Sequence, residues 1–585
     1  MQHTWWSRYP EAFEAEKAGL TAIHASWTID EIEFSAGRLV LHIEREYRGM
    51  QQKLKAVYPD SFPYFVPQVF LDEVAFGRHQ QPFDKNICLL ARDGADWQPG
   101  QDTLAVLLEE QFPKLQAVSA AELSSQLVAD QEDHVGEPFS SFLPYLPNCA
   151  VIVPDETPLP EKNAGGLLLQ ICPMSSDLEH LMNLRGVIRT ISDLAKKPLV
   201  EFHSRPPVFS QQLAGFWLRL PARPDLAGES NPETVKGHFI ELMTTNVPPF
   251  KKALLKAKRG QVLVAGFVYR DEVSWRSNSD DWFFIALRIV REAKGARPVR
   301  YEQHFIRADW GGEKAWLRRA PNLIPLRAKS ALVIGLGSLG SSLCLHLARA
   351  GVSKLHLIDC DQLQVGNTVR WALGWQYAGL QKSLALSHYL TQEYPNTAAD
   401  AYIVRIGGTY DSAGPSEYQL IRSLCEQSDL IIDSAANYRV SHFLADLARE
   451  LGKPYLWITT THGAAGGVAG RIIPGKTEGC WHCFQRSLTD GSITLPADTG
   501  ASEIQPGGCS QPTFVGAGID SDEIALLGAR LAVATLNNGQ ANGYPDFLHD
   551  VFVGDLNKNT QSIAPEWRSY NLSVNPACCA CTPHE

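Results

Sequence analysis

The chain has 585 residues, of which 44% are hydrophobic and 20% charged, and its formal net charge at pH 7 is -11. At about 150 residues per domain, three or four packed units are expected, and the composition excludes a disordered or fibrous protein. The negative charge argues against capture of a nucleic-acid backbone, which needs a basic face. The sequence shows neither a secretory signal nor the run of about 20 apolar residues that spans a membrane, so a cytoplasmic protein with no membrane partner is expected.

The N-terminal region, residues 1–145, is predicted to be a small α+β unit. Residues 10–24 have the pattern of a short helix, residues 26–47 alternate in two strand-length pieces around a Ser-Ala-Gly turn, and residues 103–127 have helical periodicity. Between the strands and the last helix, Cys88 lies in the apolar run NICLL and is followed by a Trp-x-Pro turn.

Two further segments precede the C-terminal third of the chain. Residues 146–164 are rich in proline and turn residues and are predicted to be a linker. Residues 165–317 mix apolar strand-like runs with charged loops and carry no chemical motif, which favours a connecting or docking domain of mixed α/β structure.

Residues 329–361 have the pattern of a strand, a glycine turn, an amphipathic helix and a second strand that ends in acidic residues. This order is typical of one half of a doubly wound nucleotide-binding fold. Gly335, Gly337 and Gly340 form a G-x-G-x-x-G turn, where the backbone can approach a phosphate and the helix N-terminus supplies N–H donors. Together with Asp359, the turn fits a dinucleotide as well as it fits ATP.

Three polar residues downstream of the turn favour ATP. Asn367, Arg370 and Lys382 follow in quick succession, and a nicotinamide ring needs no such cations, whereas a triphosphate does. Arginine and lysine beside one phosphate chain can neutralise the charge that develops as an attacking carboxylate displaces pyrophosphate.

In this set of motifs, residues 318–585 resemble the adenylation domain of ubiquitin-activating enzymes and of their bacterial relatives ThiF and MoeB. That family has a glycine loop, D-x-D, N-x-x-R and a downstream lysine in the same order. The resemblance implies that Asp359 holds the adenosine ribose with Asp361 nearby, and that the three polar residues serve the phosphates of Mg-ATP. It also implies a homodimer, to which Arg318 or Arg319 could contribute an arginine at the partner's nucleotide.

The sequence departs from the family pattern at two places. Trp371 stands where the family usually has glutamine, and the family's magnesium-contacting D-x-x-D-N is DSAAN here. Asp433 and Asn437 match that pattern, but Ala436 replaces the second acid. Asp433 is therefore kept as the metal-contacting candidate, and the alternative is that it stabilises the end of its strand.

The twelve cysteines are not expected to form disulfides in a reducing compartment, so paired cysteines indicate a metal. Cys480 with Cys483, and Cys578 with Cys581, form two C-x-x-C pairs nearly a hundred residues apart. Because tetrahedral Zn²⁺ takes four thiolates, we predict a structural zinc site. Most isolated cysteines are predicted to be packing residues.

Cys509 follows two glycines and precedes Ser-Gln-Pro, in a turn that is unusual for a buried structural cysteine. It occupies the position at which activating enzymes of the resembling type carry a loop cysteine that captures the acyl group as a thioester. We therefore predict Cys509 as the first nucleophile. The alternative is an unreactive loop thiol.

Residues 5–130 resemble the ubiquitin-conjugating fold, whose pattern runs Y-P, P, H-P-N, I-C-L and W-x-P. The resemblance implies that Cys88 is the conjugating cysteine, which needs no local base because it accepts an activated thioester by thiol exchange. The family's H-P-N appears as His79-Gln80-Gln81, so Gln81 replaces the asparagine that steadies the oxyanion. His79 is predicted to be structural, and the alternative for Cys88 is a core thiol in a ubiquitin-binding pseudo-enzyme.

A conjugating module ahead of an activating module resembles the all-in-one ligases of bacterial CBASS antiphage operons. That resemblance implies adenylation of the C-terminal glycine of a cGAS-like nucleotidyltransferase, capture on Cys509, transfer to Cys88 and aminolysis by a target lysine. The first alternative is the same chemistry on a separate ubiquitin-like protein. Two others belong to different classes: a nicotinamide-dependent oxidoreductase, and a non-catalytic binding scaffold suggested by Ala436 and Gln81.

Overall fold

The computed structural model describes residues 4–581 except 48–49, 72–75, 77–78, 90–96, 121–135, 155–161, 173–182, 203–207, 227–228, 275–276, 295–296, 313–314, 316–317, 409–415, 498–514 and 560. The chain forms two compact units, Met1–His203 with Phe209–Trp310, and Ser204–Val208 with Gly311–Glu585. Within the described ranges, every helix is too short or too polar to cross a bilayer.

The N-terminal part of the first unit is an antiparallel five-stranded sheet in the order β1-β2-β3-β4-β5, accompanied by helices. Its core is apolar because strands such as β2 alternate buried and exposed side chains. The elements are α1 (Trp5–Arg8), α2 (Pro10–Ala22), β1 (Ser26–Ile29), α3 (Glu31–Ser35), β2 (Val40–Tyr47), β3 (Met50–Val57), β4 (Gln68–Phe70), β5 (Asn86–Ile87), α4 (Leu104–Glu110) and α5 (Phe112–Ala120).

Residues 31–35 correct the sequence-based expectation of a longer first strand. They form α3, because the Asp30 side chain accepts hydrogen bonds from the N–H groups of Ile32 and Glu33 and so caps a helix at this point. The strand therefore ends at Ile29. Periodicity alone does not detect such a short capped turn.

A buried carboxyl joins three elements of this sheet region. Glu16 of α2 accepts hydrogen bonds from the Tyr58 hydroxyl (2.7 Å) and from the Leu104 N–H at the start of α4 (3.1 and 3.2 Å). Burial raises the pKa of Glu16 to about 7, against the lowering effect of these two bonds. Glu16 thus joins α2 both to the start of α4 and to Tyr58, which directly follows β3.

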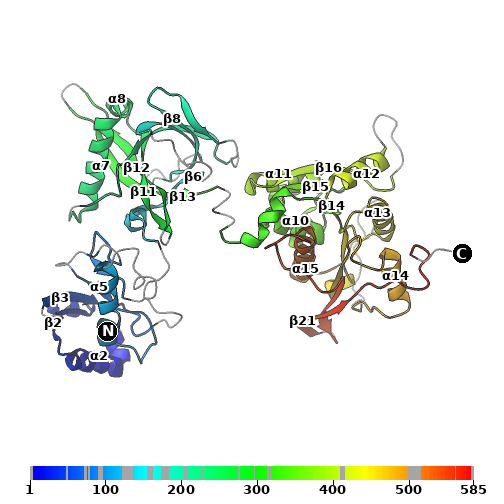
Figure 1. The fold of residues 1–585 in the computed structure, drawn as a ribbon, viewed down its shortest axis with the longest axis horizontal. Helices are drawn as coiled ribbons and strands as arrows, with labels where there is room; N and C mark the ends of the chain where they lie inside the picture. Colours follow the sequence, from blue (N-terminus) through cyan, green and yellow to red (C-terminus); the bar gives the residue numbers. More distant parts are fainter. Residues whose placement is uncertain are drawn as a thin grey trace. The chain divides into compact units, whose positions relative to one another are not determined.

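The rest of the first unit is a closed barrel with two helices against it (Figure 1). The sheet order is β6-β13-β12-β11-β10-β7-β8-β9, and an additional pairing of β6 with β8 closes the ring. The elements are η1 (Phe139–Phe142), β6 (Tyr145–Val153), β7 (Ala164–Ile171), β8 (Arg185–Asp193), β9 (Pro198–Glu201), β10 (Gln211–Arg219), α7 (Pro232–Asn246), α8 (Pro248–Lys256), β11 (Val262–Ser274), β12 (Ser277–Arg291) and β13 (Arg300–Trp310).

Strand β11 shows why this region has continuous apolar runs. Val262, Val264 and Val268 belong to one buried cluster, and the intervening Leu263 and Ala265 belong to another, which also contains apolar residues of α7 and α8. Both faces of the strand are therefore covered, and the two-residue alternation of hydrophobicity is absent.

The predicted linker, residues 146–164, contains part of an internal strand. Residues 145–153 form β6, which pairs with β13 and β8 and contributes buried Val151 and Val153. Prolines within and beside this segment are typical of a linker, which is what the sequence predicts here. Its apolar side chains, however, become buried when the barrel closes.

The second unit is built on an eight-stranded sheet in the order β16-β15-β14-β17-β18-β19-β20-β21. The five strands β16, β15, β14, β17 and β18 are parallel to one another, as expected for a doubly wound fold. Strands β19, β20 and β21 extend the sheet by antiparallel pairing. The elements are η3 (Pro321–Ala328), β14 (Ser330–Ile334), α10 (Ser338–Arg349), β15 (Lys354–Ile358), η4 (Val365–Val369), η5 (Trp375–Tyr377), α11 (Lys382–Glu393), β16 (Ala398–Tyr402), α12 (Glu417–Gln427), β17 (Leu430–Asp433), α13 (Tyr438–Glu450), β18 (Tyr455–Thr460), η6 (His462–Ala464), β19 (Gly466–Ile472), α14 (Trp481–Thr489), α15 (Gly518–Leu536), β20 (Val551–Lys558) and β21 (Gln561–Tyr570).

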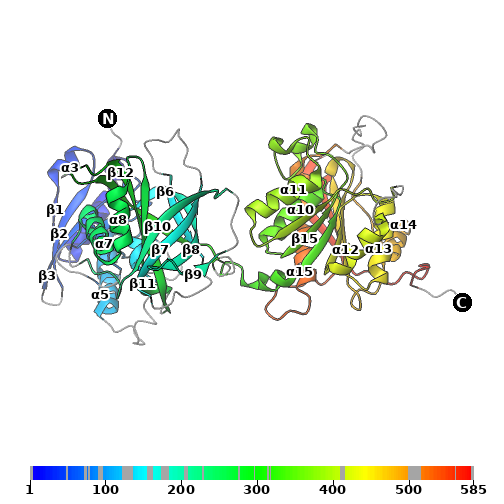
Figure 2. The same ribbon diagram turned by 90° about the horizontal axis from the view of Figure 1, so that it is seen from above.

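Helices cover both faces of this sheet. Ala331 and Val333 of β14 pack in a cluster with α10, α11 and α15, whereas Leu332 and Ile334 pack in another with α12, α13 and α14. Figure 2 shows the helices of the second cluster, α12 to α14, together on one side. The carboxyl ends of β14, β15 and β17 lie in register, with Ile334 opposite both Ile358 and Asp433.

Candidate active site

The three motif glycines lie at the carboxyl end of β14 and have different physical roles. Gly335 has a φ of 84°, and a Cβ atom there would lie 2.4 Å from the Cα of Ala435. A Cβ on Gly340 would lie 2.0 Å from the Gly335 carbonyl oxygen, so these two glycines permit close packing. A Cβ on Gly337 would meet nothing within 4 Å, and Gly337 is the N-cap of α10. The open side of the loop therefore offers helix N–H groups to an anion.

Asp359 braces this loop from the end of the neighbouring strand. Its carboxylate accepts hydrogen bonds from the N–H groups of Leu336 (2.6 Å) and Asp361 (2.7 Å). Burial raises the pKa of Asp359, although Lys382 and the two N–H donors oppose that shift. The structure thus brings together Asp359 and the glycine loop, as the sequence predicts.

Lys382 is held at the same edge. Its ammonium group lies 2.9 Å from a carboxylate oxygen of Asp361, and its N–H donates to the Asp361 carbonyl at 2.9 Å. The Lys382 side chain is 12% exposed and the Asp361 side chain 61% exposed. The cation is therefore fixed beside the strand end, while the carboxylate of Asp361 faces solvent.

Asn367 and Arg370 lie in and directly after the short helix η4. Asn367 accepts a hydrogen bond from the Gln364 N–H (3.2 Å) as part of a reciprocal capping box. Burial lowers the pKa of the Arg370 guanidinium, which remains a cation at neutral pH. The Asn367 side chain thus shapes the turn that delivers Arg370.

Two residues of this edge were not assigned a role from the sequence. The Ser434 hydroxyl donates to the carbonyls of Ile334 (3.1 Å) and Gly335 (2.6 Å), and the Trp371 indole donates to the Leu336 carbonyl at 2.7 Å. Trp371, a departure from the family pattern, thus satisfies a buried carbonyl of the glycine loop. The only available sequence signal was its position directly after the N-x-x-R motif.

Asp433 ends β17 with its carboxylate directed into the protein. It is 2% exposed, and it accepts hydrogen bonds from the Tyr455 hydroxyl (2.9 Å) and the Ala435 N–H (3.0 Å). Burial raises the pKa of Asp433. These contacts match the alternative in which it stabilises the strand end. Ala436 has a φ of 51°. The Asn437 side chain accepts hydrogen bonds from the N–H groups of Arg439 and Val440 and so caps α13.

The four paired cysteines converge at the other end of the unit. Cys480 and Cys483 lie at the start of α14, and their sulfurs are 3.8 Å apart. The sulfur of Cys578 is 3.6 Å from that of Cys480, and the sulfur of Cys581 is 3.7 Å from that of Cys483. A tetrahedral zinc ion with bonds of about 2.3 Å places its sulfur ligands about 3.8 Å apart. The donor set and spacing fit zinc.

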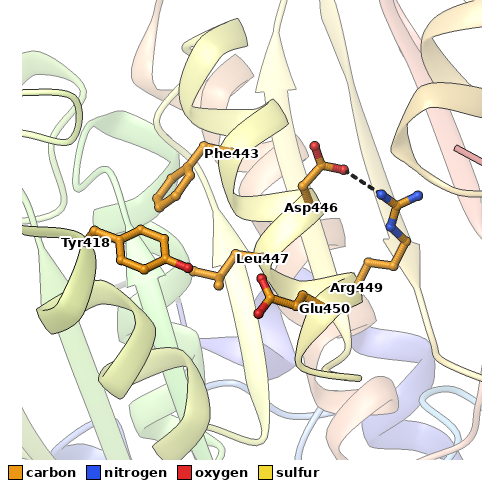
Figure 3. A pocket seen from close by; sticks show the side chains of 6 residues that line it. All are labelled: Tyr418, Phe443, Asp446, Leu447, Arg449 and Glu450. Carbon is orange, nitrogen blue, oxygen red and sulfur yellow. Dashed lines mark hydrogen bonds and ion pairs between the residues drawn. The ribbon is translucent and has the colours of Figure 1, made fainter.

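A surface pocket lies beside the cysteine cluster, between α12 and α13 (Figure 3). Arg449 lies 3.3 Å from Asp446 and also donates to the Ala580 carbonyl in the cysteine-bearing tail. Asp446 in turn lies 3.2 Å from a ring nitrogen of His482. The charged groups of the pocket therefore support the cluster, and the pocket contains none of the residues predicted to bind nucleotide. Its lining residues are Tyr418, Phe443, Asp446, Leu447, Arg449 and Glu450.

Cys88 directly follows β5 in the first unit and is exposed. Its N–H donates to the His79 carbonyl at 2.8 Å. The Trp97 indole donates to the Pro63 carbonyl, so the Trp-x-Pro turn is tied to the proline-rich segment before β4. An exposed thiol on a chain fixed by backbone bonds can be reached by a large acyl donor.

The side chains of the His79-Gln80-Gln81 sequence are engaged in structural contacts. Gln81 accepts hydrogen bonds from the N–H groups of Phe83 and Asp84 and donates to the Phe142 carbonyl (3.4 Å). His79 pairs with Glu137, as expected for a structural histidine. The Gln81 amide therefore holds the loop in shape in this arrangement.

Cys509 lies outside the described residues. Arg318 and Arg319 are exposed before η3. The isolated Cys149, Cys172, Cys344 and Cys425 are buried, whereas Cys360 is partly exposed.

Comparison with known proteins agrees with the fold of the second unit. Residues 318–536 match the ThiF family. This part of the chain thus has the nucleotide-binding fold of ThiF-type adenylation domains, at the position where the sequence predicts it.

Relatives and solved structures cover different shares of the chain. Uncharacterized protein y4oA of Sinorhizobium fredii is 26% identical over 99% of this chain and 97% of its own length. The ATP-dependent ubiquitin transferase-like protein Cap2 of Enterobacter hormaechei is 25% identical over 43% of this chain and 45% of its own. The crystal structure of Escherichia coli MccB aligns at 17% identity and a TM-score of 0.33, covering 45% of this chain and 68% of that one.

Proposed function

We propose that this protein is an ATP-dependent ligase that activates the C-terminal glycine carboxylate of a protein and conjugates it to an amine. The observation that carries the proposal is that the glycine loop, Asp359 and Lys382 meet around the carboxyl ends of β14 and β15, with Arg370 directly after η4 in the same segment, which matches the ThiF family. Ligands of open α/β sheets bind at such strand ends.

The residues at this edge suit the parts of an ATP molecule. The N–H groups of the glycine loop 335–340 and α10 face phosphate, and Asp359 binds ribose hydroxyls. Asn367 orders the turn, and Arg370 and Lys382 neutralise the charge that develops as the substrate carboxylate attacks the α-phosphate and pyrophosphate leaves. The products of this step are an acyl adenylate and pyrophosphate.

Magnesium would be held mainly by the phosphates, as is usual for Mg²⁺ bound with a nucleotide. Asp361 offers an exposed carboxylate at this edge, and the ligand atoms of Asp359, Cys360 and Asp361 lie within 4.8 Å of one another. Asp433, by contrast, is buried and bonded to Tyr455. The bound ion would lower the charge of the phosphates that face these carboxylates.

Two thiols would carry the activated acyl group. The Cys509 thiolate attacks the adenylate carbonyl and AMP leaves, which forms a thioester. The Cys88 thiolate then attacks that thioester and the Cys509 thiolate leaves. Finally a neutral amine attacks the second thioester, an amide bond forms, the Cys88 thiolate is released, and the proton lost by the amine nitrogen passes to solvent. The exposure of Cys88 supports its role as the acceptor.

The proposed donor is the C-terminus of a cGAS-like nucleotidyltransferase in antiphage defence, and a separate ubiquitin-like protein is the second candidate. Similarity to a protein named ubiquitin transferase-like supports protein conjugation in both cases. The two donors are distinguished by supplying each protein separately, with and without its terminal glycine.

The decisive experiment combines this protein with ATP, magnesium and the protein products of neighbouring genes. We expect ATP–pyrophosphate exchange, a thiol-reducible adduct that Cys509→Ala abolishes, and a second adduct that Cys88→Ala abolishes. Exchange without either adduct would limit the protein to adenylation. Substrate-dependent NAD reduction without pyrophosphate exchange would instead support an oxidoreductase, and retained conjugation in the double cysteine variant would contradict the thioester route.

The protein is further proposed to form a homodimer through its second unit. Five large apolar side chains are exposed within residues 365–384, and dimerisation would bury them. Replacing Trp375 by Glu should then shift the sedimentation coefficient toward that of a monomer, and an unchanged value would contradict this interface. The five residues are Val365, Val369, Trp375, Leu380 and Leu384.

Zinc is the proposed occupant of the cysteine cluster, with a structural role. Four sulfur ligands leave no position for water or substrate, which is typical of structural sites. The ion would join α14 to the tail that follows β21. Arg449 already bonds to this tail through the Ala580 carbonyl.

A further inference from the structure

Residues 136–143, here called the anchor segment, tie the chain that follows the N-terminal sheet to the barrel. Phe139 is 3% exposed within the core formed by the barrel and its helices, and its N–H donates to Asp271 of β11 at 2.7 Å. A Cβ on Gly136 would lie 2.7 Å from backbone atoms of Ser274. The anchor segment is therefore packed directly on β11.

Glu137 of the anchor segment binds one residue of the N-terminal sheet region at two points. One carboxylate oxygen accepts the His79 N–H at 2.9 Å, and the other lies 3.1 Å from Nδ1 of the same residue. The side chains of Glu137 and His79 are 19% and 14% exposed, so solvent screens the pair little. The Arg223 guanidinium, from the barrel side, donates to the backbone carbonyl of Glu137 at 3.0 Å and so holds the backbone of this residue.

His79 in turn holds the backbone of Cys88. Its carbonyl accepts the Cys88 N–H at 2.8 Å. His79 has a φ of 60°, in the left-handed region that residues other than glycine seldom adopt. Such a conformation persists where the surroundings fix it, and Glu137 bonds both the N–H and the ring of this residue.

Two additional contacts connect the loop before Cys88 to the barrel side. Gln81 donates to the Phe142 carbonyl at 3.4 Å, and Phe83 is 8% exposed within the core that contains Phe139. The loop of residues 79–88 thus has contacts with the barrel side through both its polar and its apolar side chains.

We propose that Glu137 is a positioning residue for acyl transfer to Cys88, acting through His79. This inference rests on the proposed function, and it assigns to the barrel the task of fixing the thiol-bearing loop. Thiol exchange requires the attacking sulfur to approach the acyl carbon in a defined direction. A misplacement of about 1 Å in such a step can cost about a hundredfold in rate.

The test compares Glu137→Ala and Glu137→Gln in the full chain with Glu14→Ala, a control carboxylate that is 70% exposed on α2. Hydrogen exchange of peptides covering residues 79–89 reports the Cys88 backbone bond without any substrate. Single-turnover transfer from Cys509 to Cys88 and ATP–pyrophosphate exchange report the two chemical steps separately. Thermal unfolding verifies that each variant is folded.

We expect Glu137→Ala to raise hydrogen exchange at residues 79–89 and to slow acyl transfer by about ten- to a hundredfold, with pyrophosphate exchange unchanged. Glu137→Gln keeps one acceptor oxygen and should give an intermediate rate. In a double-mutant cycle, adding His79→Ala to Glu137→Ala should slow transfer little further, because both changes remove the same contact.

Two outcomes separate failure of this inference from failure of the proposed function. If Glu137→Ala leaves transfer and hydrogen exchange at wild-type values, or if its effect adds fully to that of His79→Ala, the positioning role is wrong and the ligase function stands. If the wild-type protein forms no thioester on Cys88 with either donor, the proposed function is wrong, and the role of Glu137 in transfer is wrong with it.

Discussion

The nucleotide edge of the second unit and the Cys88 loop of the first unit are held in place in different ways. At the nucleotide edge, the glycine loop is braced by Asp359, Ser434 and Trp371, all from the same doubly wound fold. The Cys88 loop is braced by Glu137 from the segment that enters the barrel. The nucleotide edge is thus braced by residues of the unit that carries it, whereas the Cys88 loop depends on chain outside the sheet that carries it.

The largest expected effect is a loss of stability of the second unit, and only of that unit, when the cysteine cluster is changed. Cys480→Ser should remove zinc and lower the free energy of unfolding of the second unit by more than about 5 kcal/mol, since apparent zinc binding in small domains is about 10–16 kcal/mol. Metal analysis and pulse proteolysis with peptide mapping measure the two effects. Peptides from residues 4–120 should keep wild-type resistance.

The matched control for this change is Cys579→Ser, because Cys579 is exposed and lies outside the cluster. It should retain both the metal and the stability. Equal loss in the two variants, or resistance of Cys480→Ser to proteolysis, would contradict a structural metal at this site.

Lys382 tests whether the nucleotide edge works as proposed. Lys382→Ala removes a cation from the developing phosphate charge and should reduce kcat/KM for ATP–pyrophosphate exchange by about 10²–10³-fold, a typical cost of losing one transition-state contact. Lys354→Ala is the control, because Lys354 begins β15, at the opposite end of that strand from Asp359, and pairs with Asp400 of β16. Similar losses in both variants would indicate damage to the sheet instead.

Glu16 tests the N-terminal sheet region of the first unit, where it joins α2 to Tyr58 and to the start of α4. Its folded pKa of about 7 lies above the unfolded value of 4.5. The folded state therefore binds the proton more tightly, and this stabilisation is complete below pH 4.5 and lost as the pH rises through 7. As the pH rises between those limits, the free energy of unfolding of the wild type should fall by up to about 3 kcal/mol relative to that of Glu16→Gln.

Pulse proteolysis of the N-terminal peptides at pH 5 and pH 8 measures this difference. The free energy of unfolding of Glu16→Gln, relative to that of the wild type, should be higher at pH 8 than at pH 5, since the amide remains neutral while the carboxyl must ionise. A stability difference that is the same at both pH values would show that Glu16 does not titrate in this range.

Trp371 gives the smallest expected effect. Trp371→Phe keeps most of the buried ring but leaves the Leu336 carbonyl without its indole donor. An unsatisfied buried acceptor costs about 1–3 kcal/mol, which should appear as a raised KM for ATP and a lower unfolding midpoint of the second unit. Trp567→Phe, at a side chain that is 36% exposed on the edge strand β21, should leave the KM for ATP unchanged; equal effects of the two changes on KM would remove the assigned role of Trp371.

The sequence predicted the parts of the molecule whose signals are local. The glycine turn, Asp359 after the second strand and the two C-x-x-C pairs were located from spacing alone, because backbone geometry or ligand spacing requires those residue types there. Periodicity, in contrast, extended the first strand across residues 31–35. A single Asp30 cap decided that point, and it carries little weight in a periodicity argument.

Features that depend on distant residues were decided only by the tertiary structure. The barrel closes through the pairing of β6 with β8. The sequence predicts a linker at residues 146–153, because the burial of their apolar side chains depends on strands that follow much later in the chain. The inward direction of Asp433 depends on Tyr455, and the contact of Glu137 with His79 joins residues 58 positions apart. Neither pairing leaves a periodic pattern in the sequence, because each depends on how separate elements pack.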